Sequence, residues 1–171
     1  MNEPEVPCTK IVFFGDSITE SGRNHMDDTD LGVGYVKIAA GKLRLLYPDT
    51  KFCFLNRGVG GERTAELCAR VQKDVVDQQP DFVVLEVGIN DVWCRFSRGE
   101  EVTPDAFRAN YTYLVDTIMA TGAKLFLIQP YALKMGDKQR FRPFLAKFNE
   151  IIREIAAERR LPLIPADEIF M

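Results

Sequence analysis

Short runs of apolar residues recur along this chain and alternate with longer segments that have the apolar spacing of helices. The runs lie at residues 10–14, 52–55, 81–87, 124–129 and 163–164. A strand that is apolar on both faces is typical of a parallel sheet covered by helices on both sides. The chain is therefore expected to form an α/β fold. Its five-stranded parallel sheet would lie within a three-layer α/β/α sandwich with right-handed crossovers.

Four segments between the apolar runs have the periodicity of helices. They lie at residues 34–47, 63–78, 104–121 and a stretch that ends near residue 160. Prolines support these limits, because Pro48 and Pro80 stop the first two segments and Pro104 lies in the first turn of the third. Residues 165–171 follow the last strand, and no helix is expected there. One face of the sheet is then short of cover, which favours a homo-oligomer, since exposed apolar patches mark interfaces.

Length and composition predict a single domain over residues 1–171. The net charge is −3 and the pI is near 5.3, with no clustered basic face of the kind that binds nucleic acid. Residues 1–10 lack the basic and apolar regions of a signal peptide, and no apolar run is long enough to span a membrane. We therefore expect a cytoplasmic protein without nucleic-acid or membrane partners.

The cysteines are scattered and form no C-x-x-C pair. They are Cys8, Cys53, Cys68 and Cys94. This spacing argues against a structural zinc site and against a disulfide framework, so we expect reduced and mostly buried thiols.

Polar and glycine residues follow the first three predicted strands. They are Gly-Asp-Ser at 15–17, Asn-Arg-Gly-Val-Gly-Gly at 56–61 and Gly-Ile-Asn-Asp at 88–91. The carboxyl ends of parallel strands meet at one edge of a sheet, where ligands bind, so these loops are expected to lie together. Ester hydrolysis needs a nucleophile and preorganised donors for the oxyanion. Ser17 offers a nucleophile, the glycines offer unobstructed backbone N–H groups, and Asn90 offers a neutral side-chain donor.

These three blocks resemble those of the SGNH (GDSL-type) hydrolases. The strings at residues 15–23, 34–36 and 88–93 are most similar to acetylxylan-esterase-like members, which remove acetyl groups from sugars. The resemblance implies a flavodoxin-like fold with five parallel strands, and an acyl-serine intermediate on Ser17 without metal or cofactor. It also implies an oxyanion hole formed by the backbone N–H groups of Ser17 and Gly61 and the side-chain amide of Asn90.

The last block of that family, D-x-x-H, is absent from this chain. In the family it follows the fifth strand and its histidine is the general base, but here Asp167 is not followed by His at that offset. The first explanation is a chain truncated from a longer enzyme, which we favour because fold and site are both incomplete. The second is a short variant that has lost catalysis or borrows a base from another subunit.

The third explanation is that His25, the single histidine, substitutes as the base. Aspartates that lie nearby in the sequence would orient it: Asp27, Asp28 and Asp30. A surface histidine in a mobile loop is the simpler interpretation, and we prefer it. In each case an unactivated serine is a poor nucleophile, so the chain as given is expected to be weak or inactive.

Three further residues are candidates for substrate contact. Trp93 follows the third block and is suited either to stacking on a sugar ring or to packing in the core. Asp16 is expected to brace the first loop and to line the pocket, and Asp91 to hold the third loop. Other interpretations remain open: Ser17 as a helix cap, Asn90 as an ordinary turn residue, and residues 58–61 as a phosphate loop, which is disfavoured because the full G-x-G-x-x-G pattern is missing.

The leading hypothesis is a serine esterase that acts on small-molecule or oligosaccharide esters, acetyl esters of carbohydrates above all. One alternative is a non-catalytic flavodoxin-like module that binds acylated sugars. Another is an acylhydrolase of the lipase or thioesterase type. A flavin or phosphoacceptor module with the same sheet order is a more distant alternative.

Overall fold

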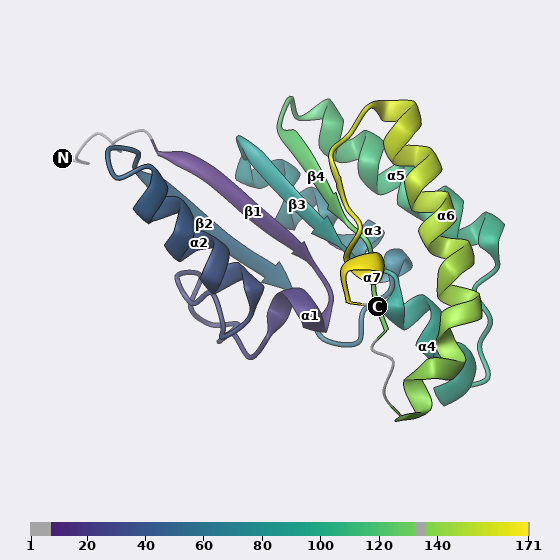
Figure 1. The fold of residues 1–171 in the computed structure, drawn as a ribbon. Helices are drawn as coiled ribbons and strands as arrows, with labels where there is room; N and C mark the ends of the chain where they lie inside the picture. Colours follow the sequence, from purple (N-terminus) through teal and green to yellow (C-terminus); the bar gives the residue numbers. More distant parts are fainter. Residues whose placement is uncertain (1–7, 133–135, 171) are drawn as a thin grey trace.

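The computed structural model describes residues 8–132 and 136–170. Its strands form one sheet in the order β2-β1-β3-β4-β5, and all neighbours are parallel (Figure 1). The strands are β1 (Thr9–Gly15), β2 (Phe52–Gly58), β3 (Phe82–Glu86), β4 (Lys124–Ile128) and β5 (Leu163–Ile164). This is the strand order of flavodoxin-like sheets, so the predicted α/β fold is confirmed.

The longer helices follow the strands in the predicted alternation. The helical segments are α1 (Ser17–Glu20), α2 (Tyr35–Leu46), α3 (Thr64–Asp74), η1 (Val76–Gln78), α4 (Ile89–Ser97), α5 (Pro104–Ala120), η2 (Gly136–Phe141), α6 (Arg142–Arg159) and α7 (Ala166–Ile169). No helix in the described residues is both long and apolar enough to cross a membrane.

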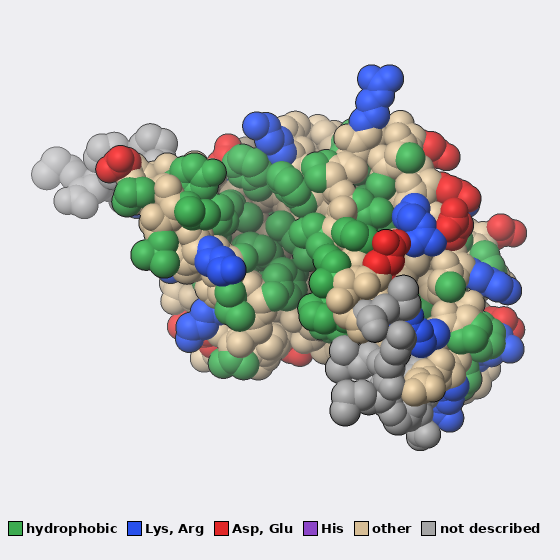
Figure 2. Space-filling view, in the orientation of Figure 1, with side chains coloured by type: hydrophobic (Ala, Val, Ile, Leu, Met, Phe, Trp, Pro, Cys, Tyr) green, Lys and Arg blue, Asp and Glu red, His purple; other side chains and the backbone are tan. Residues whose placement is uncertain are grey.

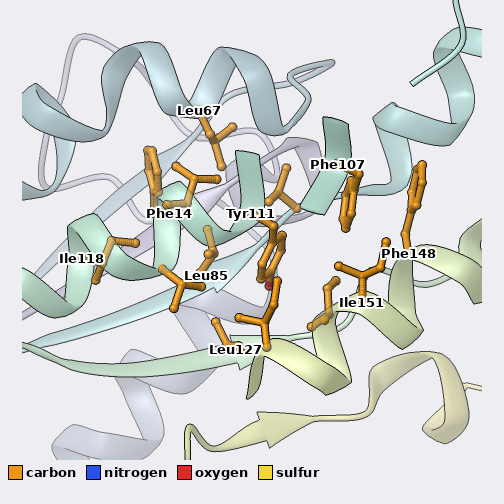
Figure 3. Packing of buried hydrophobic residues seen from close by; sticks show 14 of the residues in the cluster. Phe14, Leu67, Leu85, Phe107, Tyr111, Ile118, Leu127, Phe148 and Ile151 are labelled. Atoms are coloured by element: carbon orange, nitrogen blue, oxygen red, sulfur yellow. The ribbon is translucent and has the colours of Figure 1, made fainter. Parts of the chain in front are cut away.

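The larger core lies between the sheet and helices α3, α5 and α6. Alternate side chains of the central strands, Phe14 in β1 and Leu85 in β3 among them, are fully buried on this face (Figure 3). Between α5 and α6 the rings of Phe107 and Phe148 stack with their centroids 4.1 Å apart. Burial of this many apolar side chains makes the sheet a rigid support for the loops at its edge.

The opposite face of the sheet has less cover. Within the described residues, the helical members of the smaller core cluster all come from α2, whose Val36 and Ala40 are buried. Beside α2 an apolar groove of about 540 Å³ is lined by residues that include Phe13, Phe82 and Phe126. Apolar side chains gather in the hollow at this place in the space-filling view (Figure 2). The expected shortage of cover on one face is therefore present in the described structure.

Two helices differ from the sequence prediction. Residues 88–91 were expected to form a turn, but Gly88 is the N-cap of α4, a helix of nine residues. Its short length and its polar start, Asn90 and Asp91, hide the helical periodicity. The expectation of no helix after β5 is also wrong, because the four-residue α7 begins at Ala166.

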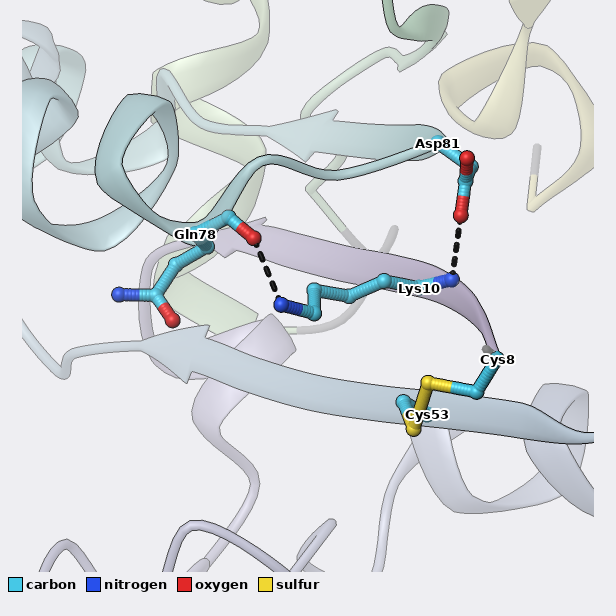
Figure 4. Close-up of a disulfide and its surroundings, with 5 residues drawn as sticks. All are labelled: Cys8, Lys10, Cys53, Gln78 and Asp81. Carbon is cyan, nitrogen blue, oxygen red and sulfur yellow. Dashed lines mark hydrogen bonds between the residues drawn. A yellow bond between two sulfur atoms is a disulfide. The ribbon is translucent and has the colours of Figure 1, made fainter. Parts of the chain in front are cut away.

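The prediction that all cysteines are reduced is wrong. Cys8 and Cys53 form a disulfide at the amino-terminal ends of β1 and β2 (Figure 4). These residues are 45 positions apart in sequence, and the parallel register, in which Lys10 lies opposite Cys53, brings them together. Cys68 and Cys94 are free thiols. The disulfide removes one reason for expecting a cytoplasmic protein, because such bonds persist in oxidising compartments.

Candidate active site

The turn between β1 and α1 places Ser17 at the edge of the sheet. Glycine is needed at position 15, because a Cβ there would lie 2.2 Å from the backbone oxygen of Glu86. Asp16 then caps α1, and its side chain accepts a hydrogen bond from the Ile18 backbone N–H at 3.0 Å. Ser17 is the first residue of α1 and is exposed. Capping therefore accounts for Asp16 and leaves the Ser17 hydroxyl free for chemistry.

The loop after β2 packs against the same helix. A Cβ on Gly58 would lie 2.1 Å from the backbone nitrogen of Glu20, so only glycine permits this close approach. Gly61 has a φ of +81°, a left-handed conformation that glycine adopts without steric cost. Gly61 and Ser17 line one cavity. This placement fits the expected role of the Gly61 N–H as a donor to an oxyanion.

Asn90 lies in the first turn of α4 and lines the same cavity. Its Nδ2 donates a hydrogen bond to the backbone oxygen of Glu62 at 2.8 Å. A primary amide has two N–H donors, so this bond fixes the side chain and leaves one donor for a ligand. The loop that carries Gly61 therefore orients the Asn90 side chain. An ordinary turn residue does not need its side chain to be fixed in this way.

Asp91 is buried beneath the cavity rather than on its surface. Its carboxylate accepts hydrogen bonds from the Thr64 hydroxyl at 2.6 Å and from the Thr64 backbone N–H at 3.1 Å. Burial raises the pKa of Asp91 to about 6, and the bonds from Thr64 oppose this rise. Asp16 is buried as well, and neither residue lines the cavity. Both positions suit bracing of the loops and not the contact with substrate that we expected.

The cavity that contains Ser17, Gly61 and Asn90 has a volume of about 580 Å³. Trp93 lines it and is 44% exposed, and its ring lies 5.3 Å from that of Phe141. The other lining residues are Ile18, Arg63, Ile89, Cys94, Ser97, Arg98, Tyr131 and Ala132. The predicted site residues other than Asp16 and Asp91 are thus brought together around one hollow.

The charged side chains among these lining residues are arginines. Arg63 is paired with Glu66 at 2.7 Å and with Glu100 at 2.8 Å, and these partners hold its pKa far above the ordinary value. Arg98 lines the cavity without a carboxylate partner in the described structure. The carboxylates neutralise Arg63, so Arg98 is the lining cation that can favour the negative charge that develops during attack on an ester.

His25 does not line this cavity. It lies in the exposed loop after α1, and its Nε2 contacts Oε1 of Glu20 at 2.5 Å. The aspartates that were expected to orient it have other partners, because Asp27 accepts from Thr29, Asp28 pairs with Arg57, and Asp30 accepts from Asn24 and Gly32. The prediction that these aspartates orient His25 is wrong. No hydrogen bond among the described residues joins its imidazole to Ser17.

Sequence reasoning missed several residues of the cavity wall. The sequence did not predict α4, on which Ser97 lies one turn beyond Trp93, so the contacts of Ser97 and Arg98 with the cavity could not be read from it. Tyr131 follows β4, so it could have been found by applying the rule for strand ends to the fourth strand. Phe141 had no such signal, because it lies at the end of η2, well beyond the residues that directly follow β4.

The chain matches the model of the GDSL-like Lipase/Acylhydrolase family over residues 13–171. It is 31% identical over 157 residues to an acetylxylan esterase from Geobacillus stearothermophilus, covering 87% of this chain and 72% of that protein. It is also 26% identical over 172 residues to the uncharacterized lipoprotein YqeF of Bacillus subtilis (strain 168), covering 90% of this chain and 69% of that one.

Solved structures share the fold. The crystal structure of the Geobacillus esterase Axe2 matches with a TM-score of 0.86 and 29% identity, over 95% of this chain and 78% of that one. LAE5, an alpha/beta hydrolase enzyme from the metagenome of Lake Arreo, matches with a TM-score of 0.87, 27% identity and the same coverages, 95% and 78%. Further structures of Axe2 are described as catalytic mutants in which a serine, an aspartate or a histidine is replaced by alanine. With its blocks assembled in one cavity, the chain belongs to the GDSL-like lipase/acylhydrolase family of carboxylic ester hydrolases.

Proposed function

We propose that this protein acts on short-chain acyl esters, acetyl groups on carbohydrates above all, through an acyl intermediate on Ser17. The observation that carries the proposal is that Ser17, Gly61 and Asn90 line one cavity at the carboxyl edge of the sheet. Acyl transfer needs a nucleophile and donors for the oxyanion. The exposed Ser17 hydroxyl can supply the first, and the Gly61 N–H and the Asn90 amide the second.

The reaction follows from this arrangement. The Ser17 Oγ attacks the ester carbonyl carbon, and the carbonyl oxygen becomes an oxyanion that accepts hydrogen bonds from the Ser17 N–H, the Gly61 N–H and the Asn90 amide. The bond to the alcohol then breaks, and the alcohol leaves with the proton that Ser17 has lost. Water attacks the acyl-Ser17 ester, releases the carboxylic acid and restores the hydroxyl.

The proton on the Ser17 hydroxyl needs an acceptor. The sequence holds no histidine after His25, whereas catalytic mutants of Axe2 replace an aspartate or a histidine. We propose that residues 1–171 hold the nucleophile and the oxyanion donors without the activating base. Turnover by these residues alone is then limited to what transition-state binding supplies.

The wall of the cavity supports a short acyl group and a sugar. The indole of Trp93 packs against the buried ring of Phe141, and a half-exposed indole is suited to stacking on a sugar ring. Arg63, Ser97 and Arg98 add polar groups to this wall, beside apolar residues that include Ile18, Ile89 and Ala132. A long lipid chain would leave the three polar groups without water, which favours a carbohydrate ester over a lipid.

The experiment that tests this function compares release of acetate from acetylated xylooligosaccharides by the wild-type protein and by Ser17→Ala. We expect acetate release by the wild type, even if slow, to fall to the background rate in the variant. Equal rates in both proteins would overturn the proposal.

The second candidate is a non-catalytic module that binds acylated sugars. The observation that favours it is the lack of a histidine among the described residues that line the cavity. The two candidates are separated by the same comparison, because a binding module retains affinity for the acetylated sugar and shows no Ser17-dependent release of acetate.

A further inference from the structure

Two carboxyl groups are buried together directly behind Ser17. Asp16 precedes the serine, and Glu86 is the last residue of β3, where its backbone lies opposite Gly15 in the parallel register. Both side chains are fully buried, with 0% exposure. Acidic residues are almost never buried to this extent unless they are paired, so this arrangement needs a physical reason.

The hydrogen bonds of the two groups leave one oxygen on each without a donor. Asp16 uses Oδ1 to accept from the Ile18 N–H at 3.0 Å, and Glu86 uses Oε2 to accept from the Thr19 hydroxyl at 3.5 Å. Within the described residues, no N–H or O–H group reaches the other oxygens, Asp16 Oδ2 and Glu86 Oε1. The two side chains are close enough for each to shift the pKa of the other. One proton between them satisfies both oxygens.

The surroundings keep this proton in place. Burial raises the pKa of Asp16 to about 6, and burial together with the neighbouring Asp16 raises the pKa of Glu86 well above its ordinary value. The groups that face the pair from other elements are hydroxyls: Thr19 from α1, Tyr35 from α2, Tyr111 from α5 and Tyr131 after β4. Among the described interactions of Glu86, none involves a cation. Ionisation of both carboxyls would therefore place two uncompensated charges in the core.

We propose that Glu86 carries a proton, donates it in a hydrogen bond to Asp16, and thereby positions Ser17 at the start of α1. In this proposal, Glu86 donates a hydrogen bond to Asp16, and Asp16 accepts one from the Ile18 N–H. The second bond fixes the turn that places the Ser17 hydroxyl and backbone N–H. Glu86 is thus a positioning residue of the esterase site, a role that rests on the proposed function.

Glutamine is the matched substitution at position 86. A protonated carboxyl has one donor and one acceptor in this setting, and the glutamine amide reproduces both, with its nitrogen toward Asp16 and its oxygen toward Thr19. Leucine has a similar volume and removes the donor. The pair Glu86→Gln and Glu86→Leu therefore separates the hydrogen bond from the space that the side chain fills.

The proton itself is observed by infrared spectroscopy of the wild-type protein and Glu86→Gln at about pH 8, where exposed carboxyls are ionised. We expect the wild type to show the carbonyl stretch of a buried protonated carboxylic acid, and Glu86→Gln to lack it. Asp91→Asn, which changes a buried carboxyl bonded to Thr64 instead, is the control and keeps the band. Absence of the band from the wild type overturns the proposal.

The positioning role is observed in the backbone amide resonances of Ser17 and Ile18 in ¹⁵N-labelled protein. We expect Glu86→Gln to keep these resonances near their wild-type places and Glu86→Leu to displace them or to prevent folding. Displacement by Glu86→Gln, or no displacement in folded Glu86→Leu, overturns the role. Neither measurement requires turnover. They therefore test the role of Glu86 independently of the esterase activity, which the comparison with Ser17→Ala tests.

Discussion

The hydroxyl of Thr64, the first residue of α3, donates a hydrogen bond of 2.6 Å to the carboxylate of Asp91 in α4. The same carboxylate accepts the Thr64 backbone N–H, so a negative group lies at the amino-terminal end of a helix, where the helix dipole favours it. Asp91 thereby fixes α4 against α3. Asn90 and Trp93 lie on α4, so this buried contact determines the positions of both side chains in the cavity wall.

The first prediction concerns Asp91 and pH. Its pKa is raised to about 6 in the folded protein, so its protonated form contributes stability below the ordinary carboxyl pKa, and that contribution is lost as the pH rises through 6. We expect the free energy of unfolding of the wild type, relative to Asp91→Asn, to fall by about 2–3 kcal/mol between about pH 4 and pH 8. Denaturant unfolding across this range measures it.

The control for this prediction is Asp105→Asn, an exposed carboxyl in the first turn of α5. Its unfolding free energy is expected to follow the wild-type curve. A wild-type curve parallel to that of Asp91→Asn would show that burial does not raise the pKa of Asp91.

The second prediction concerns the disulfide between Cys8 and Cys53. It joins residues 45 positions apart, so its loss is expected to lower the free energy of unfolding by about 3–4 kcal/mol through the entropy of the unfolded chain. Dithiothreitol should destabilise the wild type by this amount and leave Cys8→Ser unchanged. Equal sensitivity of the two proteins to the reductant would contradict the bond.

The third prediction uses the single tryptophan of the chain. Trp93 is 44% exposed in the cavity, so its fluorescence reports on ligands that enter there. Acetylated xylooligosaccharides are expected to shift the emission of the wild type to shorter wavelength and to give a saturable titration. Glucose at the same concentrations serves as the control. The absence of any change would argue against stacking of a sugar on Trp93.

The fourth prediction concerns Asn90, the side-chain donor that we propose for the oxyanion hole. Removal of one such donor typically lowers kcat by about 10²–10³. Asn90→Ala is therefore expected to lower Ser17-dependent acetate release by this factor, with little effect on KM. Asn24→Ala, in the exposed loop after α1, is the control and keeps wild-type turnover. A change confined to KM would indicate that Asn90 binds the ground state only.

The sequence was most informative where the physical signal is local. The apolar runs around Phe14, Val83 and Leu125 predicted strands, and the loops after the first three strands predicted where Ser17, Gly61 and Asn90 meet. Both inferences need only the rule that parallel strands end at one edge. The uncovered sheet face followed in the same way from the order of the elements.

What the sequence did not reveal depends on partners far apart in the chain. The pairing of Cys8 with Cys53 follows from strand register, which spacing alone does not give. Asp16 is buried beside Glu86, a residue that the sequence shows only as part of an ordinary strand. Polar residues at the start of α4 concealed a helix, and with it the contacts that bring Ser97 and Arg98 into the cavity wall.

We propose that residues 1–171 hold a nucleophile and an oxyanion hole but no activating base. The most direct test is acetate release from an acetylated xylooligosaccharide with increasing imidazole, which supplies a base from solution, in the wild type and in Ser17→Ala. We expect imidazole to raise the rate of the wild type in a saturable way and to raise that of Ser17→Ala only to the protein-free background. Equal stimulation of both proteins, or none in either folded protein, would contradict it.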